Sequence, residues 1–165
     1  MQVDAELNQI AGEMNLTTIP VNGDGECLFY ATNAAHFAQQ NTFLLNHRIL
    51  RLVACTVARN FLLHPNNWIE GPEGSISSMR SIESALLPGR DSYDGSMFHA
   101  LASIRNGTII IIGENRNEAP QEFEPLTEML RILYAPNQAP PRTLPIHLLH
   151  RTTAAPLHFD ATAVR

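Results

Sequence analysis

Apolar residues recur along this chain with two different spacings, and each spacing predicts one kind of secondary structure. Hydrophobic positions three and four residues apart form one face of a helix. Short apolar runs bounded by turn residues, or residues that are mostly β-branched, are typical of strands. The first spacing predicts helices over about 4–14, 27–39, 46–62, 75–87 and 97–105, and the second predicts extended segments at 18–21, 108–112, 144–149 and 157–162.

The boundaries of these segments carry their own signals. Asn46 is placed to cap the third helix, whose apolar stripe runs from Ile49 to Leu62 and ends before Pro65. Cys55 lies inside this stripe and is interpreted as core packing, since a free cysteine behaves as a small hydrophobe. Segments 66–74 and 113–121 are predicted as loops, and 123–134 fits either a helix or a strand.

The fold class follows from the order of these elements. The strand at 108–112 is too apolar to be exposed on either face, and it follows a helix directly. The last two strands are joined by a short turn and predict an antiparallel hairpin at the end of the chain. We therefore expect an α/β (α+β) fold, with helices packed around a small, partly antiparallel sheet.

Composition narrows the class of protein. With 165 residues and 44% hydrophobic content, the chain is predicted to form one domain over residues 1–165, and no apolar run reaches the roughly 20 residues of a membrane span. A net charge of −5 without a basic cluster argues against nucleic acid as a partner. Two cysteines without a C-x-x-C pair argue against a zinc site and favour a reducing, cytoplasmic environment, and no signal peptide is visible. We expect a monomer.

The candidate nucleophile is Cys27, which stands where a glycine-rich turn meets an apolar helical pattern. The positive end of a helix favours a thiolate over a thiol. Backbone N–H groups of the preceding residues Asp24, Gly25 and Glu26 would point toward the attacked carbonyl and form an oxyanion loop.

The candidate base is His158, on the last predicted strand. Residues two apart in a strand share a face, so Asp160 stands beside His158 while Phe159 points into the core. A carboxylate in this place fixes the tautomer and orientation of the imidazole. Cys27, His158 and Asp160 therefore form a candidate catalytic triad.

These segments resemble a known family. The run 24–29, Asp-Gly-Glu-Cys-Leu-Phe, resembles the Asp-Gly-Asn-Cys-Leu-Phe signature of the OTU (ovarian tumour) cysteine proteases, and 157–160 resembles their closing His-aromatic-Asp/Asn motif. Residues 47–51 look like the family's His-x-x-Leu-Arg helix, and 93–102 loosely match a Trp-Gly-Gly segment with its helix. The resemblance covers roughly residues 19–162.

The resemblance implies a papain-like OTU fold, with the cysteine at a helix N-terminus and the histidine on a late strand. It implies a deubiquitinase in which Cys27 attacks, His158 acts as base and Asp160 orients it, without metal or cofactor. The implied partner is ubiquitin, a polyubiquitin chain or a ubiquitin-like protein. Glu26 replaces the family's asparagine, Tyr93-Asp94 replaces Trp-Gly, and the glutamate usual after that turn is missing. These departures suggest a divergent member from a bacterium or virus, acting in the host cytosol if it is a pathogen effector.

Three other functions are compatible with parts of the same sequence. The His158-x-Asp160 pair matches two ligands of a non-haem iron site, but only five residues follow Asp160 and no further histidine is among them. Segment 22–26 looks like part of a calcium loop, but Cys27 and Asn33 stand where that loop needs glycine and glutamate. A ubiquitin-binding module that keeps the fold but has lost catalysis remains as the alternative function.

Overall fold

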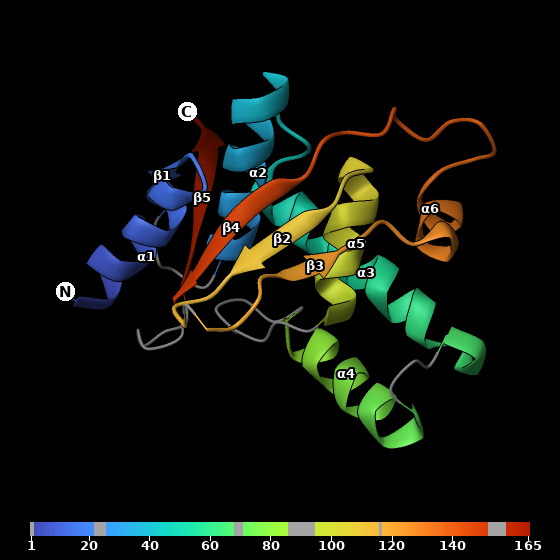
Figure 1. The fold of residues 1–165 in the computed structure, drawn as a ribbon. Helices are drawn as coiled ribbons and strands as arrows, with labels where there is room; N and C mark the ends of the chain where they lie inside the picture. The colour runs from blue at the N-terminus through green and yellow to red at the C-terminus, as the bar shows by residue number, and fades with distance from the viewer. Residues whose placement is uncertain (1, 22–25, 68–70, 86–94, 116, 152–157) are drawn as a thin grey trace.

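Five strands form a single mixed sheet in the order β1-β5-β4-β2-β3, and helices pack on it (Figure 1). The computed structural model describes residues 2–21, 26–67, 71–85, 95–115, 117–151 and 158–165. β2 and β4 run parallel, whereas the other neighbouring strands are antiparallel. The elements are α1 (Gln2–Glu13), β1 (Leu16–Ile19), α2 (Cys27–Gln40), α3 (His47–Leu62), the 3-10 turn η1 (Pro65–Asn67), α4 (Gly71–Ala85), α5 (Gly95–Arg105), β2 (Ile109–Ile112), β3 (Gln121–Phe123), α6 (Thr127–Leu133), β4 (Ile146–Arg151) and β5 (His158–Val164).

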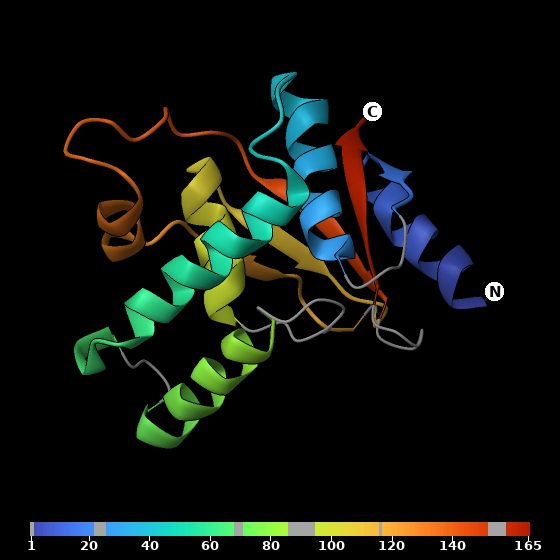
Figure 2. The same ribbon diagram turned by 180° about the vertical axis from the view of Figure 1, so that it is seen from behind.

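The sheet divides the apolar interior into two clusters of unequal size. Alternate residues of β2, β4 and β5 join the larger cluster together with α2, α3 and α5. The intervening residues Ile112 and Leu149 meet Leu7 and Ala11 of α1 in a smaller cluster. Figures 1 and 2 accordingly show α2, α3 and α5 on one side of the sheet and α1 beside β1. The predicted α/β class is confirmed.

The helices mostly begin and end where the sequence predicts. Asn46 caps α3, because its side-chain Oδ1 accepts a hydrogen bond from Arg48 N at 3.0 Å. Asn106 ends α5 in the left-handed conformation, with φ of 49°. Several predictions are wrong in detail. The strands predicted at 18–21 and 144–149 are each displaced by two residues, to Leu16–Ile19 and Ile146–Arg151. Ile49 is not part of the buried stripe, since 52% of it is exposed, and α4 begins at Gly71 inside the predicted 66–74 loop.

The early start of α4 and the ambiguous segment have simple physical explanations. Pro72 lies in the first turn of α4, where a missing N–H has no intrahelical acceptor to lose. Segment 123–134 divides into the end of β3 and the short helix α6, so its mixed pattern reflects two elements. The predictions for residues 22–25, 68–70, 86–94 and 152–157, including the turn at 91–94 and the hairpin turn, concern segments outside the described residues.

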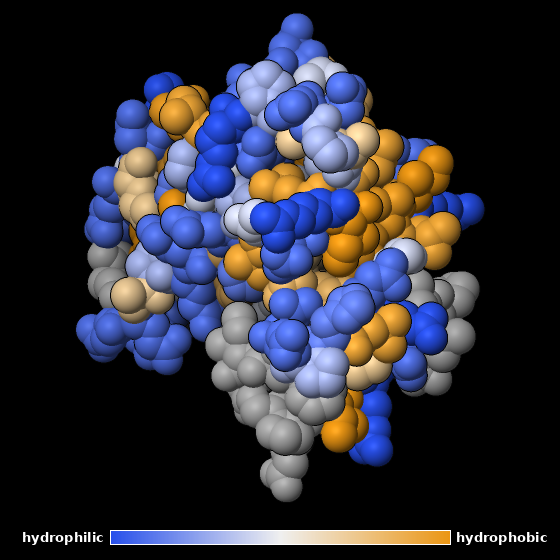
Figure 3. Space-filling view, turned by 90° about the vertical axis from the view of Figure 1, so that its right-hand side faces the viewer, coloured by the Kyte–Doolittle hydropathy of each residue, from blue (hydrophilic) through white to orange (hydrophobic). Residues whose placement is uncertain are grey.

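Several large apolar side chains remain on the surface. Figure 3 shows hydrophobic side chains gathered on part of one face, with hydrophilic ones around them. Ile49 and Leu52 of α3 are 52% and 57% exposed, and Phe43, just before that helix, is 62% exposed. Exposed apolar groups of this kind are available for contacts with another protein. In the described part of the chain, every helix is too short or too polar to cross a membrane.

Candidate active site

Cys27 is the first residue of α2, as the sequence predicts. The helix forms because small and apolar residues repeat on one face, and Leu28, Ala31 and Ala35 are buried against the sheet. Asn41 closes its other end in the left-handed conformation, with φ of 58°. The Cys27 side chain itself is fully buried. Of the predicted oxyanion loop, Asp24 and Gly25 lie outside the described residues, and Glu26 is described.

His158 and Asp160 lie next to each other on β5, and their side chains are hydrogen-bonded. His158 Nε2 is 2.7 Å from Asp160 Oδ1. Phe159, between them, is fully buried in the larger apolar cluster. The strand spacing therefore predicted this pair correctly. Since Nε2 faces the carboxylate, Nδ1 is the ring nitrogen left to exchange a proton with a reacting group.

The Asp160 carboxylate is almost completely buried, with 1% exposed, and three groups surround it. Besides His158, the backbone N–H of Val21 donates to Oδ1 at 3.0 Å. Arg151 Nη2, from the last residue of β4, lies 2.7 Å from Oδ2. Such charge-assisted hydrogen bonds hold a carboxylate in one orientation. Sequence reasoning missed Arg151 because it placed that residue in the hairpin turn.

The helix that carries Cys27 packs along the strand that carries His158 and Asp160. In both ribbon views the N-terminal ends of α2 and β5 lie at the same end of the sheet (Figures 1 and 2). The hydrogen bond from Val21 to Asp160 holds Val21, six residues before Cys27, beside β5 at this end of the sheet. The fold thus gathers the early and late predicted segments at one edge of the molecule.

Glu26 directly precedes the cysteine but does not cap α2 with its side chain. Its carboxylate turns toward α3, where Oε2 lies 3.0 Å from His47 Nε2 and Oε1 lies 3.9 Å from Arg51 Nη1. Tyr30 Oη, one turn along α2, is 2.9 Å from the same His47 nitrogen, and the two rings stack at 4.1 Å. The sequence indicates no role for His47 beyond its place in the His-x-x-Leu-Arg helix, so these contacts were missed. The i, i+4 spacing of His47 and Arg51 was the available signal.

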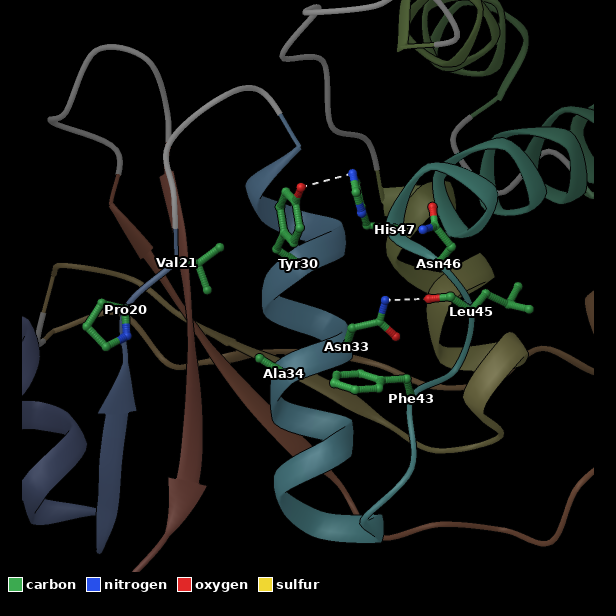
Figure 4. A pocket seen from close by; sticks show the side chains of 9 residues that line it. All are labelled: Pro20, Val21, Tyr30, Asn33, Ala34, Phe43, Leu45, Asn46 and His47. Atoms are coloured by element: carbon green, nitrogen blue, oxygen red, sulfur yellow. Dashed lines mark hydrogen bonds between the residues drawn. The ribbon is translucent and has the colours of Figure 1, made fainter.

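A cavity of about 490 Å³ opens between α2, the end of β1 and the start of α3 (Figure 4). Tyr30 and His47 form one end, with their hydrogen bond drawn, and Asn33 donates to the carbonyl of Leu45 at 2.7 Å. The remaining lining is largely apolar: Pro20, Val21, Ala34, Phe43, Leu45 and the cap residue Asn46.

Other titratable groups near the sheet behave as packing residues. Burial raises the pKa of the Cys55 thiol to about 11, so it stays protonated near neutral pH. Burial also lowers the pKa of His147 and of His150, although Glu122 and Glu114 oppose the two shifts. Within the described ranges, His, Cys, Asp and Glu residues do not come together in a group of three that could hold a metal ion.

Comparison with known proteins identifies the fold. No family model and no curated protein matches the sequence. Among solved structures, the OTU domain of OTUD1 aligns over 96% of this chain and 93% of its own, with 18% identity and a TM-score of 0.60. An OTU deubiquitinase from Wolbachia pipientis wMel aligns over 92% and 90%, with 13% identity and a TM-score of 0.56. The Hazara virus OTU bound to ubiquitin aligns over 91% and 82%, with 17% identity and a TM-score of 0.56. The chain therefore has the OTU fold.

Proposed function

We propose that this OTU-fold chain is a cysteine peptidase that cleaves the peptide or isopeptide bond after the C-terminal glycine of ubiquitin or a ubiquitin-like protein. Cys27 is the nucleophile, His158 the base and Asp160 its orienting partner. The observation that carries the proposal is the partly buried His158–Asp160 hydrogen bond of 2.7 Å, on the strand that packs against the helix headed by Cys27.

The reaction begins with transfer of a proton from the Cys27 thiol to Nδ1 of His158. Asp160 holds Nε2 of the same ring and stabilises the imidazolium that results. The N-terminal end of α2 stabilises the thiolate, because aligned peptide dipoles leave partial positive charge there.

The thiolate then attacks the carbonyl carbon of the substrate glycine, and a C–S bond forms as negative charge moves to the carbonyl oxygen. Backbone N–H groups of the segment Asp24, Gly25 and Glu26 are proposed to stabilise that oxygen. The C–N bond breaks as His158 gives its proton to the leaving amine, which leaves a thioester on Cys27. Water, deprotonated by His158, attacks the thioester, and the sulfur leaves with the proton restored to the Cys27–His158 pair.

Ubiquitin is proposed as the substrate because solved structures with a similar fold are a deubiquitinase and a ubiquitin complex. The Wolbachia protein is an OTU deubiquitinase, and the Hazara virus OTU was solved bound to ubiquitin. The exposed side chains of Ile49 and Leu52 also suit a protein partner better than a small molecule.

A second function is favoured by one observation. The Cys27 side chain is fully buried, so a substrate carbonyl reaches the sulfur only after neighbouring atoms move. A domain that binds ubiquitin without cleaving it would have no need of that movement. This alternative keeps the same fold and partner.

A ubiquitin probe with a C-terminal electrophile distinguishes the two functions. Covalent labelling of the wild-type chain that is lost in Cys27→Ala and in His158→Ala is the result expected for the peptidase. Cys55→Ala is the matched control, because that thiol is buried with its pKa raised to about 11, and it should label like the wild type.

Binding of the probe without labelling would overturn the catalytic assignment and support the binding module. Labelling that persists in Cys27→Ala would mean that the nucleophile has been assigned wrongly. If the probe neither binds to the chain nor labels it, ubiquitin is not the partner.

A further inference from the structure

Glu26 presents an electrostatic difficulty for a catalytic cysteine. A carboxylate beside a thiolate disfavours its ionisation, because like charges repel. Glu26 occupies the position directly before Cys27, at the N-cap of α2, where φ is −116° and ψ is 13°. Its side chain makes no capping hydrogen bond to the helix. Its carboxylate lies instead beside two residues of α3, His47 and Arg51.

Two side chains on one face of α3 receive this carboxylate. His47 Nε2 lies 3.0 Å from Oε2, and Arg51 Nη1 lies 3.9 Å from Oε1. Residues four apart on a helix lie one above the other, so His47 and Arg51 each contact one oxygen of the same carboxylate. About a fifth of the Glu26 side chain is exposed, 22%, so solvent screens the pairs only in part.

His47 and Arg51 are themselves held in place by contacts with other elements. Arg51 Nε donates to the carbonyl of Ala85 at the end of α4 at 2.7 Å, and its guanidinium lies 5.7 Å from the centre of the Phe29 ring. His47 stacks on Tyr30 and shares a 2.9 Å hydrogen bond with it (Figure 4). Because these partners come from α2 and α4, the position of the carboxylate is fixed by packing.

We propose that Glu26 is a positioning residue whose carboxylate, held by His47 and Arg51, fixes the entry into α2 and is kept from opposing the Cys27 thiolate. This inference rests on the proposed role of Cys27 as the nucleophile. It also explains how a glutamate is tolerated at this position: α3 supplies the compensating charge.

The sign of each change follows from the charged groups around the cysteine segment. Among the described residues these are Arg51 and His47 on α3, His158 and Asp160 on β5, and Arg151 on β4, which pairs with Asp160. Tyr30 on α2 contributes a neutral hydroxyl. Removing the Glu26 charge while keeping its shape takes a negative charge away from the residue before Cys27, which favours the thiolate. Keeping the charge but shortening its reach releases the carboxylate from α3, which disfavours the thiolate.

The test is a pH titration of the Cys27 thiolate, followed by its ultraviolet absorbance in the absence of any ubiquitin. Cys27→Ser, titrated in parallel, supplies the background from tyrosines. Cys55 adds nothing below about pH 9, because its pKa is raised to about 11. We expect Glu26→Gln to move the midpoint down by about half a pH unit, and Glu26→Asp to move it up by a similar amount.

His47→Ala is the third variant, and it should raise the midpoint because the carboxylate loses its nearer partner. In the Glu26→Gln background the same change should no longer raise it. Midpoints that move in one direction for both Glu26 variants, or that do not move in any of the three, would overturn the proposal. If the Glu26 variants fail to fold, His47→Ala alone decides, with an unchanged midpoint as the contrary result.

A merely structural role would not produce opposite shifts at one position. Because no ubiquitin is present, the outcome is also separable from the proposed peptidase activity. Opposite shifts in a chain that the ubiquitin probe does not label would retain the role of Glu26 and reject the activity.

Discussion

Arg151 and Asp160 form an ion pair across the β4–β5 hairpin, with 2.7 Å between Nη2 of the arginine and Oδ2 of the aspartate. In the strand register, Arg151 lies opposite His158, so the arginine and the histidine reach the same carboxylate from neighbouring strands. The carboxylate is shared between a permanent cation and an imidazole. Arg151 therefore helps to hold the carboxylate that orients His158.

Replacing Arg151 with Met should lower the free energy of unfolding by about 3 kcal/mol, since the buried Asp160 carboxylate loses its cation. Urea unfolding measures this loss. The same change should lower kcat/KM on a ubiquitin amide, because the carboxylate that orients His158 loses the group that holds its Oδ2. Arg151→Lys keeps the charge and should lie close to the wild type in both measurements. A Met variant with an unchanged kcat/KM would limit Arg151 to a role in stability.

Removal of His158 should affect turnover more strongly than removal of Asp160. His158→Ala deletes the proposed base, and we expect kcat/KM on a ubiquitin amide to fall by at least about 10³-fold. Asp160→Ala keeps the base but lets its ring rotate, and its loss should be about 10-fold or more smaller than that of His158→Ala. Asp160→Asn, which can still accept a hydrogen bond from Val21, should lose less than Asp160→Ala. Equal losses for His158→Ala and Asp160→Ala would mean that the roles are assigned wrongly.

Stability should decrease on acidification because of His36, which is 5% exposed and accepts a hydrogen bond at Nδ1 from Arg105 Nε at 3.3 Å. Burial, and then the Arg105 charge, lower the pKa of His36 from 6.5 to about 4. Between these values the unfolded chain binds a proton that the folded chain does not. The free energy of unfolding should thus fall by up to about 3 kcal/mol from pH 6.5 to 4. Above pH 6.5 His36 is neutral in both the folded and the unfolded chain, so it no longer makes stability depend on pH.

Urea unfolding at a series of pH values measures this dependence. His36→Gln can still accept the hydrogen bond from Arg105 but does not titrate, so its stability should depend less on pH over the same range. A slope equal to that of the wild type would assign the acid sensitivity elsewhere. His147 and His150, whose pKa values burial also lowers, are the next groups to replace.

Much of the fold was predictable because it depends on local periodicity. The helix at Cys27, the cap at Asn46 and the buried β2 strand are each encoded by adjacent residues, and each lies where its pattern indicates. The start of α4 was missed because its composition is polar and contains glycine, although Pro72 is a residue that the first turn of a helix accepts. The exposure of Ile49 depends on which neighbours α3 meets.

The site was predictable only in part, for a related reason. The His158–Asp160 bond depends on strand alternation within three residues and was predicted correctly. The Arg151–Asp160 and Glu26–His47 pairs join separate elements, and their geometry depends on the hairpin register and on how α3 crosses the start of α2. A spacing pattern does not contain that information.

The cap of α3 provides a last prediction, because the helix it begins carries the residues that receive Glu26. Asn46 Oδ1 accepts the N–H of Arg48 at 3.0 Å, and His47 is the first residue of the helix. Asn46→Ala should lower the free energy of unfolding by about 1 kcal/mol, since an N–H at the helix start loses its partner. Asn46→Asp keeps an acceptor and should retain wild-type stability within about 0.5 kcal/mol. Fraying at His47 should also raise the midpoint of the Cys27 thiolate titration in Asn46→Ala but not in Asn46→Asp. If stability falls while that midpoint stays constant, the first turn of α3 is held by Tyr30 and Glu26 without help from its cap.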